Sequence, residues 1–267
     1  MKYQTLKGFR DLLPDEMQIR NEIISKTRKL VEKYGFLPLD TPTLEQADLL
    51  LGKYGEEEKL IYKFKDFGGR DIALRYDLTV SLARIIDNYK GQLSFPFKRY
   101  QIGKVFRAEK PQKGRFREFE QFDVDIVGTS DAISDAEIIA MISEWISSFG
   151  LKFIIKINDR KILDALLSEA SVDKKDAKAV FIAIDKLDKI GFEGVKKELE
   201  GIKYSSKIEK FLQQNNKEIE SFDKVVNDPE ALLNLKKVMA YAKKLGAKNL
   251  VFGVLAENFC LGDRVLR

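Results

Sequence analysis

Two stretches in the first half of the chain alternate hydrophobic and polar residues at a period of two. They cover residues 100–108 and 116–127, and the segment between them includes a proline, a glycine and three positive charges. A period of two is typical of β-strands, and proline and glycine mark turns. The pattern therefore predicts a hairpin whose two strands are joined by a charged loop at residues 110–115.

The second predicted strand has a polar face that carries Phe119, Gln121, Asp123 and Asp125, because successive side chains of a strand point to opposite sides. Half-buried strands usually turn only scattered polar residues to solvent, so this ordered set suggests a bound polar ligand. The alternative is an exposed hairpin whose charges pair across its strands. Residue types alone do not choose between the two.

The first predicted strand ends in residue types that fit a nucleotide. Arg107 offers a planar fork of donors that can hold a phosphate or a carboxylate. Glu109 lies two residues further along, on the same predicted face, and could accept a hydrogen bond from an exocyclic amine.

Other periodicities outline the rest of the chain. Helices are predicted at residues 16–34, 78–89 and 131–149, a strand at 151–157, and a loop or short hairpin at 52–70. From about residue 161 to 245 the pattern is helical and rich in lysine and glutamate, which suggests an inserted helical domain. The first helix is predicted to bury one stripe, made of Met17, Ile19, Ile23, Ile24, Leu30 and Val31.

Composition excludes several classes of site. The 267 residues contain no histidine, which excludes histidine–metal sites and serine–histidine or cysteine–histidine pairs, and no other metal site is predicted. The single cysteine, Cys260, excludes an internal disulfide and suits a reducing cytosol. No apolar run approaches the roughly 20 residues of a membrane-spanning helix, and the start lacks a signal-peptide core, so a cytoplasmic protein is expected.

Size and charge constrain the fold only weakly. With 44% hydrophobic residues the chain can bury a core and form one or two domains. The net charge of +5 permits an anionic partner without requiring one.

The predicted hairpin also carries a sequence motif. Residues 106–121 read FRAEKPQKGRFREFEQ. This resembles motif 2 of class II aminoacyl-tRNA synthetases in the wording of the histidyl-tRNA synthetase family, F-R-x-E-R-P-Q-K-G-R-x-R-x-F-x-Q. The notable departure is Lys110, where the family usually has arginine.

Further segments extend the resemblance along the chain. Residues 7–14, KGFRDLLP, resemble the family's opening K-G-x-x-D-x-x-P, and residues 73–79, ALRYDLT, resemble its L-R-P-E/D-x-T. Residues 34–45, YGFLPLDTPTLE, are similar to motif 1, a helix leading into a strand that ends at Pro42, which builds the dimer interface in class II enzymes. Residues 158–163 and 185–191 also resemble segments of these synthetases.

The resemblance implies an α+β fold: a class II synthetase-like mixed, mostly antiparallel sheet flanked by helices, with a helical insertion. The implied domains are a catalytic core at residues 1–158, a helical insertion domain at 159–248, and a return to the core at 249–267. In the family, the insertion contacts the acceptor arm of tRNA.

The resemblance also assigns residues to ligands. It implies that Arg107 is catalytic, holding the ATP α-phosphate and the substrate carboxylate. Glu109 would meet the adenine amine, Arg115 the outer phosphates, and Phe119 would stack on adenine. On the loop, Lys110 and Gln112 would approach the end of the tRNA.

The implied histidine-binding residues are Asp77, Thr79, Arg107, Gln121 and Asp125. Asp77 and Thr79 are two residues apart and would face the same way on a strand, where a carboxylate and a hydroxyl can accept from an ammonium. The alternative is that Asp77 ends a strand and Thr79 caps a helix. Asp125 is one methylene shorter than the glutamate that the family usually carries.

The family continues beyond the motifs found here, with an R-G-L-x-Y-Y-T-G segment, motif 3 and an anticodon-binding domain. Arg267 follows Val-Leu at the end of this sequence and resembles the arginine of that segment, so it is a second catalytic candidate. The expectation is an incomplete catalytic domain that activates histidine with ATP and Mg²⁺ and is weak or inactive alone. Its expected partners are histidine, ATP, tRNA(His) and a second copy joined through the motif 1 region.

Two alternative functions stay open. One is a non-catalytic histidine-sensing paralogue that resembles the regulatory subunit of ATP phosphoribosyltransferase. The other is a structural fragment that only dimerises through motif 1. The intact charged residues of the motif 2 loop favour the enzyme.

Overall fold

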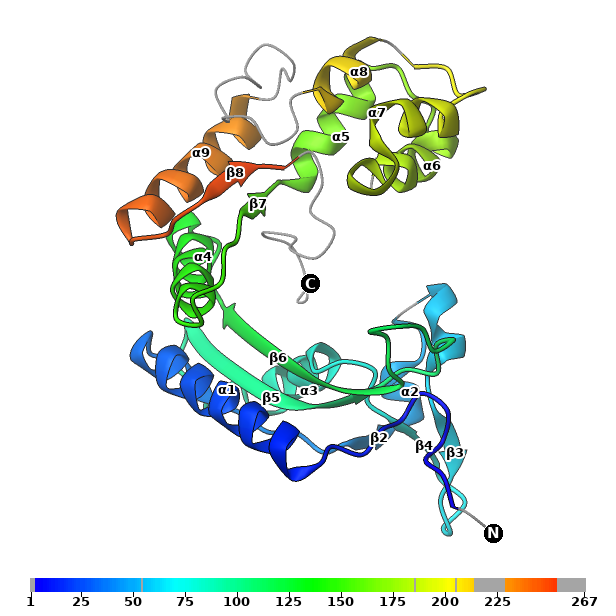
Figure 1. Cartoon of the computed structure of the whole chain (residues 1–267), viewed down its shortest axis with the longest axis vertical. Coiled ribbons are helices and arrows are strands. Elements are labelled where there is room, and N and C mark those ends of the chain that lie inside the picture. Colours follow the sequence, from blue (N-terminus) through cyan, green and yellow to red (C-terminus); the bar gives the residue numbers. More distant parts are fainter. Residues whose placement is uncertain (1–2, 54, 185, 205, 214–228, 254–267) are drawn as a thin grey trace. The chain divides into compact units, whose positions relative to one another are not determined.

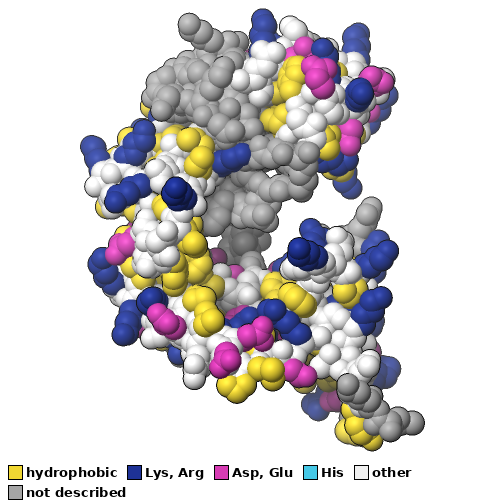
Figure 2. Space-filling view, in the orientation of Figure 1, with side chains coloured by type: hydrophobic (Ala, Val, Ile, Leu, Met, Phe, Trp, Pro, Cys, Tyr) yellow, Lys and Arg dark blue, Asp and Glu magenta, His cyan; other side chains and the backbone are white. Residues whose placement is uncertain are grey.

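The computed structural model describes residues 3–253 except 54, 185, 205 and 214–228. By packing, the chain divides between Thr129 and Ser130 into two compact units (Figure 1). On the face drawn in Figure 2, lysine and arginine side chains are scattered over both units and do not gather in one patch.

The first unit is built on a three-stranded sheet in the order β1-β5-β6. The long strands β5 (Phe97–Phe106) and β6 (Glu118–Val127) pair antiparallel, which confirms the predicted hairpin. β1 (Leu37–Pro38) pairs parallel with β5. Both hairpin strands stop short of the predicted loop. The backbone there hydrogen-bonds outside the hairpin, since the Ala108 N–H donates to the Leu60 carbonyl at 2.8 Å.

The register of the hairpin gathers the predicted polar face. Arg99 lies opposite Asp125, Gln101 opposite Asp123, and Gly103 opposite Gln121. Residues directly opposite each other point to the same side of a sheet. Arg99 and Gln101, which were not singled out from the sequence, therefore join the polar face predicted for β6.

Helix α1 (Pro14–Lys33) lies along the opposite face of the sheet (Figure 1). It begins with a proline, whose missing N–H costs nothing in the first turn. Arg20 of α1 pairs with Glu120 of β6 at 2.9 Å, and the Tyr100 hydroxyl donates to Glu32 at 2.7 Å. The helix is thus attached to the even-numbered side chains of both strands.

The stripe predicted for α1 is partly wrong. Val31 is buried, but Ile19 and Ile23 are 63% and 41% exposed. The buried line of the helix instead includes Thr27, which sits four residues before Val31. Because Arg20 reaches the sheet, the contact side of the helix is rotated away from Ile19 and Ile23.

A second small sheet has the order β2-β4-β3 and is antiparallel throughout. Its strands are β2 (Leu44–Gln46), β3 (Lys63–Lys65) and β4 (Asp71–Leu74), with the short helices α2 (Ala47–Leu50) and η1 (Gly55–Leu60) between β2 and β3. Helix α3 (Thr79–Tyr89) follows β4 and is tied to β2, because Ser81 donates to buried Glu45 at 2.8 Å.

The strand predicted to end at Pro42 is shorter than expected. β1 ends at Pro38, although the Leu39 N–H still donates to the Tyr100 carbonyl at 2.9 Å. Prolines at 38 and 42 have no N–H to give to a ladder, so regular pairing stops there.

The second unit is mainly helical, as the periodicity predicts. Its elements are α4 (Ala132–Ser147), β7 (Ile155–Ile157), α5 (Arg160–Glu169), α6 (Lys174–Ile184), α7 (Leu187–Glu198), α8 (Ser206–Leu212), α9 (Pro229–Lys244) and β8 (Leu250–Phe252). β7 and β8 pair in parallel, and their core includes Ile162, Leu166, Phe211 and Phe252. α4 packs against α9 within this unit. The domains predicted at residues 1–158, 159–248 and 249–267 were defined by the order of the motifs and not by packing. They stay a prediction.

A buried arginine joins the parts of the first unit. The Arg75 side chain donates from Nε to the Lys104 carbonyl at 2.7 Å and from Nη1 to the Thr41 carbonyl at 2.6 Å. It passes so close to Gly103 that a Cβ there would lie 2.5 Å from Arg75 Nη2. The absence of a side chain at position 103 therefore makes room for this crossing.

We expect Gly103→Ala to destabilise the first unit by about 1–3 kcal/mol, because overpacking forces a buried group to move. Gly91→Ala is the matched control, since a Cβ at position 91 would meet nothing within 4 Å. Urea unfolding of both variants measures the difference. Equal midpoints for the two would contradict the packing role of Gly103.

Candidate functional site

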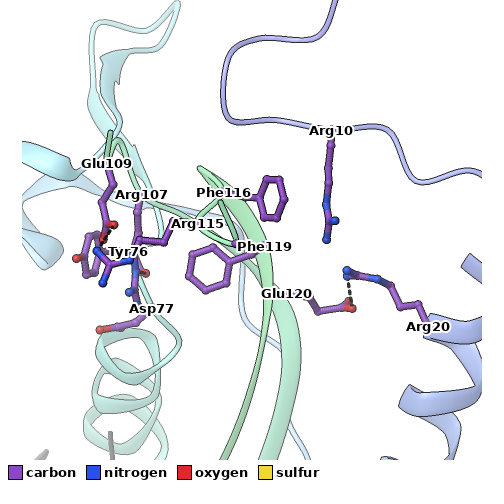
Figure 3. Close-up of a pocket in the computed structure, with 11 residues that line it drawn as sticks. Arg10, Arg20, Tyr76, Asp77, Arg107, Glu109, Arg115, Phe116, Phe119 and Glu120 are labelled. Carbon is purple, nitrogen blue, oxygen red and sulfur yellow. Dashed lines mark hydrogen bonds and ion pairs between the residues drawn. The ribbon is translucent and has the colours of Figure 1, made fainter. Parts of the chain in front are cut away.

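A pocket of about 760 Å³ lies in the first unit beside the end of the hairpin. Its lining residues are Arg10, Arg20, Tyr76, Asp77, Arg107, Glu109, Gly114, Arg115, Phe116, Phe119 and Glu120 (Figure 3). Four of these are arginines and three are carboxylates, with three aromatic rings among them. The combination suits a ligand with negative charge and a flat ring.

The structure brings five of the predicted site residues together in this lining: Asp77, Arg107, Glu109, Arg115 and Phe119. Thr79, Gln121, Asp125, Lys110 and Gln112 are not part of it. Gln121 and Asp125 lie further along the polar face of β6, and Lys110 and Gln112 are exposed on the loop. Arg267 lies outside the described residues.

Arg107 lies near two aromatic rings, on the side of the pocket that Tyr76 and Asp77 line (Figure 3). Its guanidinium carbon lies 4.5 Å from the ring centre of Tyr76 and 5.1 Å from that of Phe119. Its Nε donates to the Tyr76 carbonyl at 3.2 Å, and Nη2 lies 3.5 Å from Gln121 Oε1. These contacts fix the position of the guanidinium before any ligand binds.

Glu109 and Arg115 face each other across the loop, 3.4 Å apart. The loop closes through backbone bonds between Gln112 and Arg115, with the Arg115 N–H donating at 3.0 Å. In this state the Glu109 carboxylate is therefore paired with the arginine predicted to meet the outer phosphates.

The start of the chain holds the loop from the outside. Arg117 donates from its backbone N–H to the Gly8 carbonyl at 2.8 Å and from Nε to the Glu109 carbonyl at 2.9 Å. Gly8 has φ +90°, and a Cβ there would lie 2.8 Å from the Arg117 side chain. Two residues later, Arg10 stacks on Phe116 at 4.1 Å.

Asp77 lies at the start of α3, so the strand premise for Asp77 and Thr79 is wrong. β4 ends at Leu74, and Thr79 is the first residue of the helix. Asp77 Oδ1 accepts from the backbone N–H groups of Thr79 and Val80, at 3.0 and 3.2 Å. The first backbone N–H groups of a helix have no partner within the helix, and the Asp77 carboxylate accepts from two of them. It thereby stabilises the start of α3 at this point of the chain.

Deeper on the same sheet face lies a cluster of charged groups. Arg99 is fully buried, and its Nη2 lies 2.6 Å from Asp125 Oδ2. Gln121 donates to both carboxylate oxygens of Asp123, at 2.9 and 3.1 Å. Burial raises the pKa of Asp123 and of Asp125, and the positive charge of Arg99 opposes that rise in both. Burial also lowers the pKa of Arg99.

Sequence reasoning missed several lining residues: Arg10, Arg20, Tyr76, Phe116 and Glu120. Arg10, Tyr76 and Phe116 stand inside the quoted motifs, so their place beside the motif residues was a usable signal. Arg20 on α1 has the appearance of any surface helix arginine, and only the pairing with Glu120 brings it to the pocket.

Among the described residues, no three or more cysteine, aspartate or glutamate side chains form a group that could hold a metal ion. No helix in the same part of the chain is long and apolar enough to cross a membrane.

Comparison with known proteins places the chain in context. It is 43% identical over 259 residues to the histidine–tRNA ligase of Clostridium tetani, covering 91% of this chain and 58% of that protein. It is 49% identical over 198 residues to that of Aeropyrum pernix, covering 73% and 45%. The chain thus spans about half the length of the curated relatives it matches.

Solved structures share the fold. The crystal structure of histidyl-tRNA synthetase from Nostoc sp. PCC 7120 matches with a TM-score of 0.80 at 28% identity, covering 94% of this chain and 61% of that one. An ATP phosphoribosyltransferase regulatory subunit/histidyl-tRNA synthetase from Bacillus halodurans matches with a TM-score of 0.82 at 21% identity, covering 95% and 68%. The latter shows likeness of fold alone, and both confirm the predicted α+β class.

The model of the family described as histidyl-tRNA synthetase matches residues 8–254. That range holds the pocket, the hairpin and the helical unit. The resemblance inferred from the motifs is thereby confirmed, and the chain belongs to the histidyl-tRNA synthetase family.

Proposed function

We propose that this chain forms the part of a histidine–tRNA ligase that activates histidine with ATP and serves tRNA(His). The observation that carries the proposal is Arg107, which lies near two aromatic rings in a pocket lined by arginines. Family membership supplies the amino acid and the reaction.

The proposed reaction has two steps, transfer of AMP to histidine and transfer of the histidyl group to tRNA. The histidine carboxylate attacks the α-phosphorus of ATP, which forms a new P–O bond and releases pyrophosphate. The 3′-terminal ribose hydroxyl of tRNA then attacks the carbonyl carbon of histidyl-adenylate, and AMP leaves. Because the first nucleophile is already an anion, the protein needs to position it and to offset phosphate charge, not to supply a base.

Arg107 would do both in the first step. Its planar fork can hold an α-phosphate oxygen and the substrate carboxylate together. Phe119 offers a ring face for adenine. Glu109 and Arg115 would separate on binding, so that the carboxylate meets the adenine amine and the guanidinium meets the outer phosphates.

The histidine itself would lie along the polar face of β6. Gln121 contacts Arg107 at one end and Asp123 at the other, so it links the reacting end of the pocket to the carboxylates. Asp77, at the start of α3, and Asp125 would accept from the substrate N–H groups, with Thr79 beside Asp77. Lys110 and Gln112, exposed on the loop, would reach the tRNA end.

Three further features belong to the proposal. Mg²⁺ would enter with ATP, since this ion is usually held by substrate phosphates and few protein ligands. A homodimer would form through the motif 1 segment, where Leu37 and Leu44 are 59% and 45% exposed. The proposed place of action is the cytoplasm.

Histidine-dependent exchange of pyrophosphate into ATP, with Mg²⁺, tests the function directly. We expect exchange that disappears when histidine is omitted. Labelled pyrophosphate enters ATP only when it reacts with histidyl-adenylate in the reverse of the first step. Histidine binding without exchange would instead favour the histidine-sensing alternative. A chain that binds neither ATP nor histidine would leave only the structural alternative.

We expect Arg107→Ala to lower the exchange rate about 100- to 1000-fold, the cost of removing one donor from a developing charge. The same variant should lose ATP binding in calorimetry. Arg70→Ala is the control, because Arg70 is an arginine paired with Asp66 in the β3–β4 turn, outside the pocket. Unchanged exchange in Arg107→Ala would refute the assignment of the α-phosphate site.

A further inference from the structure

Arg99 on β5 is a buried cation with unused donors. Its side chain is fully buried, and its Nε and both terminal nitrogens make no hydrogen bond within the described residues. Nη2 lies 2.6 Å from Asp125 Oδ2, and the two groups form an ion pair. A guanidinium has five N–H groups, and leaving them unpaired in a buried place is costly.

Buried Arg75 and partly exposed Arg84, two other arginines of the first unit, are used differently. Arg75 donates from Nε and Nη1 to backbone carbonyls, so its donors hold the fold together. Arg84 makes a hydrogen-bonded pair with buried Glu45 at 2.7 Å. Arg99 instead lies opposite the Asp125 carboxylate on the polar face of the hairpin. The next pair on that face is Gln101 and Asp123.

The charges around Arg99 do not balance. Three carboxylates interact electrostatically with Arg99: Asp125 and Asp123 on β6, and Asp77 before α3. A second guanidinium, that of Arg107, interacts with Asp123. Three carboxylates against two guanidiniums leave one negative charge when all are ionised. That surplus complements one cation, and the amino group of an amino acid carries one.

We propose that Arg99 is a positioning residue for the amino-acid substrate: it keeps the Asp125 carboxylate charged and oriented so that β6 can accept the substrate N–H groups. The inference rests on the proposed function, since it names how that same site holds its amino acid. Arg99 does not touch the reacting atoms, and acts through Asp125.

The chemistry of burial explains why such a residue is needed. Two partly buried carboxylates two residues apart on one strand face each resist ionisation, because both lose water and repel each other. Without a fixed cation behind them they would take up protons more readily and become poorer acceptors. The planar fork of arginine also resists rotation better than a lysine ammonium would.

The test compares Arg99→Met with the parent chain by calorimetry of histidine binding at pH 6.0 and pH 8.5. Removing the cation leaves Asp125 more easily protonated, so the loss of affinity is largest at low pH. We expect a loss of about 10- to 100-fold at pH 6.0, the range seen when a hydrogen-bond partner of a metal ligand is removed, and a smaller loss at pH 8.5. ATP affinity, measured in parallel, should stay near that of the parent.

Arg84→Met is the matched control, because it removes an arginine from another carboxylate pair of the same unit. It is expected to leave the pH trend of histidine binding unchanged. If Arg99→Met does not fold, a double variant is used that carries both Arg99→Met and Asp125→Asn and so leaves the net charge unchanged. Its histidine affinity is compared with that of Asp125→Asn alone. Equal histidine affinity in these two is expected, since Arg99 acts through Asp125.

Parent-like histidine binding in Arg99→Met would overturn the inference. An equal loss at both pH values accompanied by a loss of ATP affinity would overturn it as well, because that pattern marks a general structural defect. A further loss in the double variant would show that Arg99 does not act through Asp125. A parent chain that binds no histidine would overturn the proposed function itself.

Discussion

The pairing register of β5 and β6 decides which polar groups of the two strands share one face. Side chains alternate along a strand, so a shift of β6 by one residue would turn Asp123 and Asp125 toward α1, away from Arg99, and would bring Glu120 to the face of Arg99. Pairs on both faces oppose such a shift. Arg20 holds Glu120 on the helix side, and Arg99 faces Asp125 on the polar side. The hairpin is thus fixed from two directions.

The site has two electrostatic regions along this one hairpin. Near the loop, Arg107, Arg115 and Arg10 line the pocket, where four arginines outnumber three carboxylates. Further along the strands the carboxylates of β6 gather around Arg99. A zwitterion that is to be joined to a phosphate needs this order, with its carboxylate toward the arginines and its amine toward the acids. Gln121 lies at the boundary and contacts both sides.

Much of this could be predicted from the sequence, because strand alternation and motif wording are local signals. The hairpin, its polar face and the helical second half followed from them. What failed depended on tertiary contacts. Asp77 was placed on a strand although a helix was predicted from residue 78, because residue types alone do not show that β4 ends as early as Leu74. Ile19 belonged to a good apolar stripe, yet the pairing of Arg20 with β6 chose another side of the helix. Arg99 was overlooked because burial of a charge cannot be read from alternation alone.

The contact between Gly8 and Arg117 has a consequence for how the site comes into being. Arg117 bonds back to the Lys7 carbonyl, 110 residues earlier in the chain, and to that of Gly8. During synthesis the first segment leaves the ribosome long before its partner exists. Closing so long a loop carries an entropic cost that local hairpin contacts do not. The motif 2 loop therefore reaches its observed geometry only after both hairpin strands have been made, and the segment at Lys7 and Gly8 cannot contact Arg117 before then.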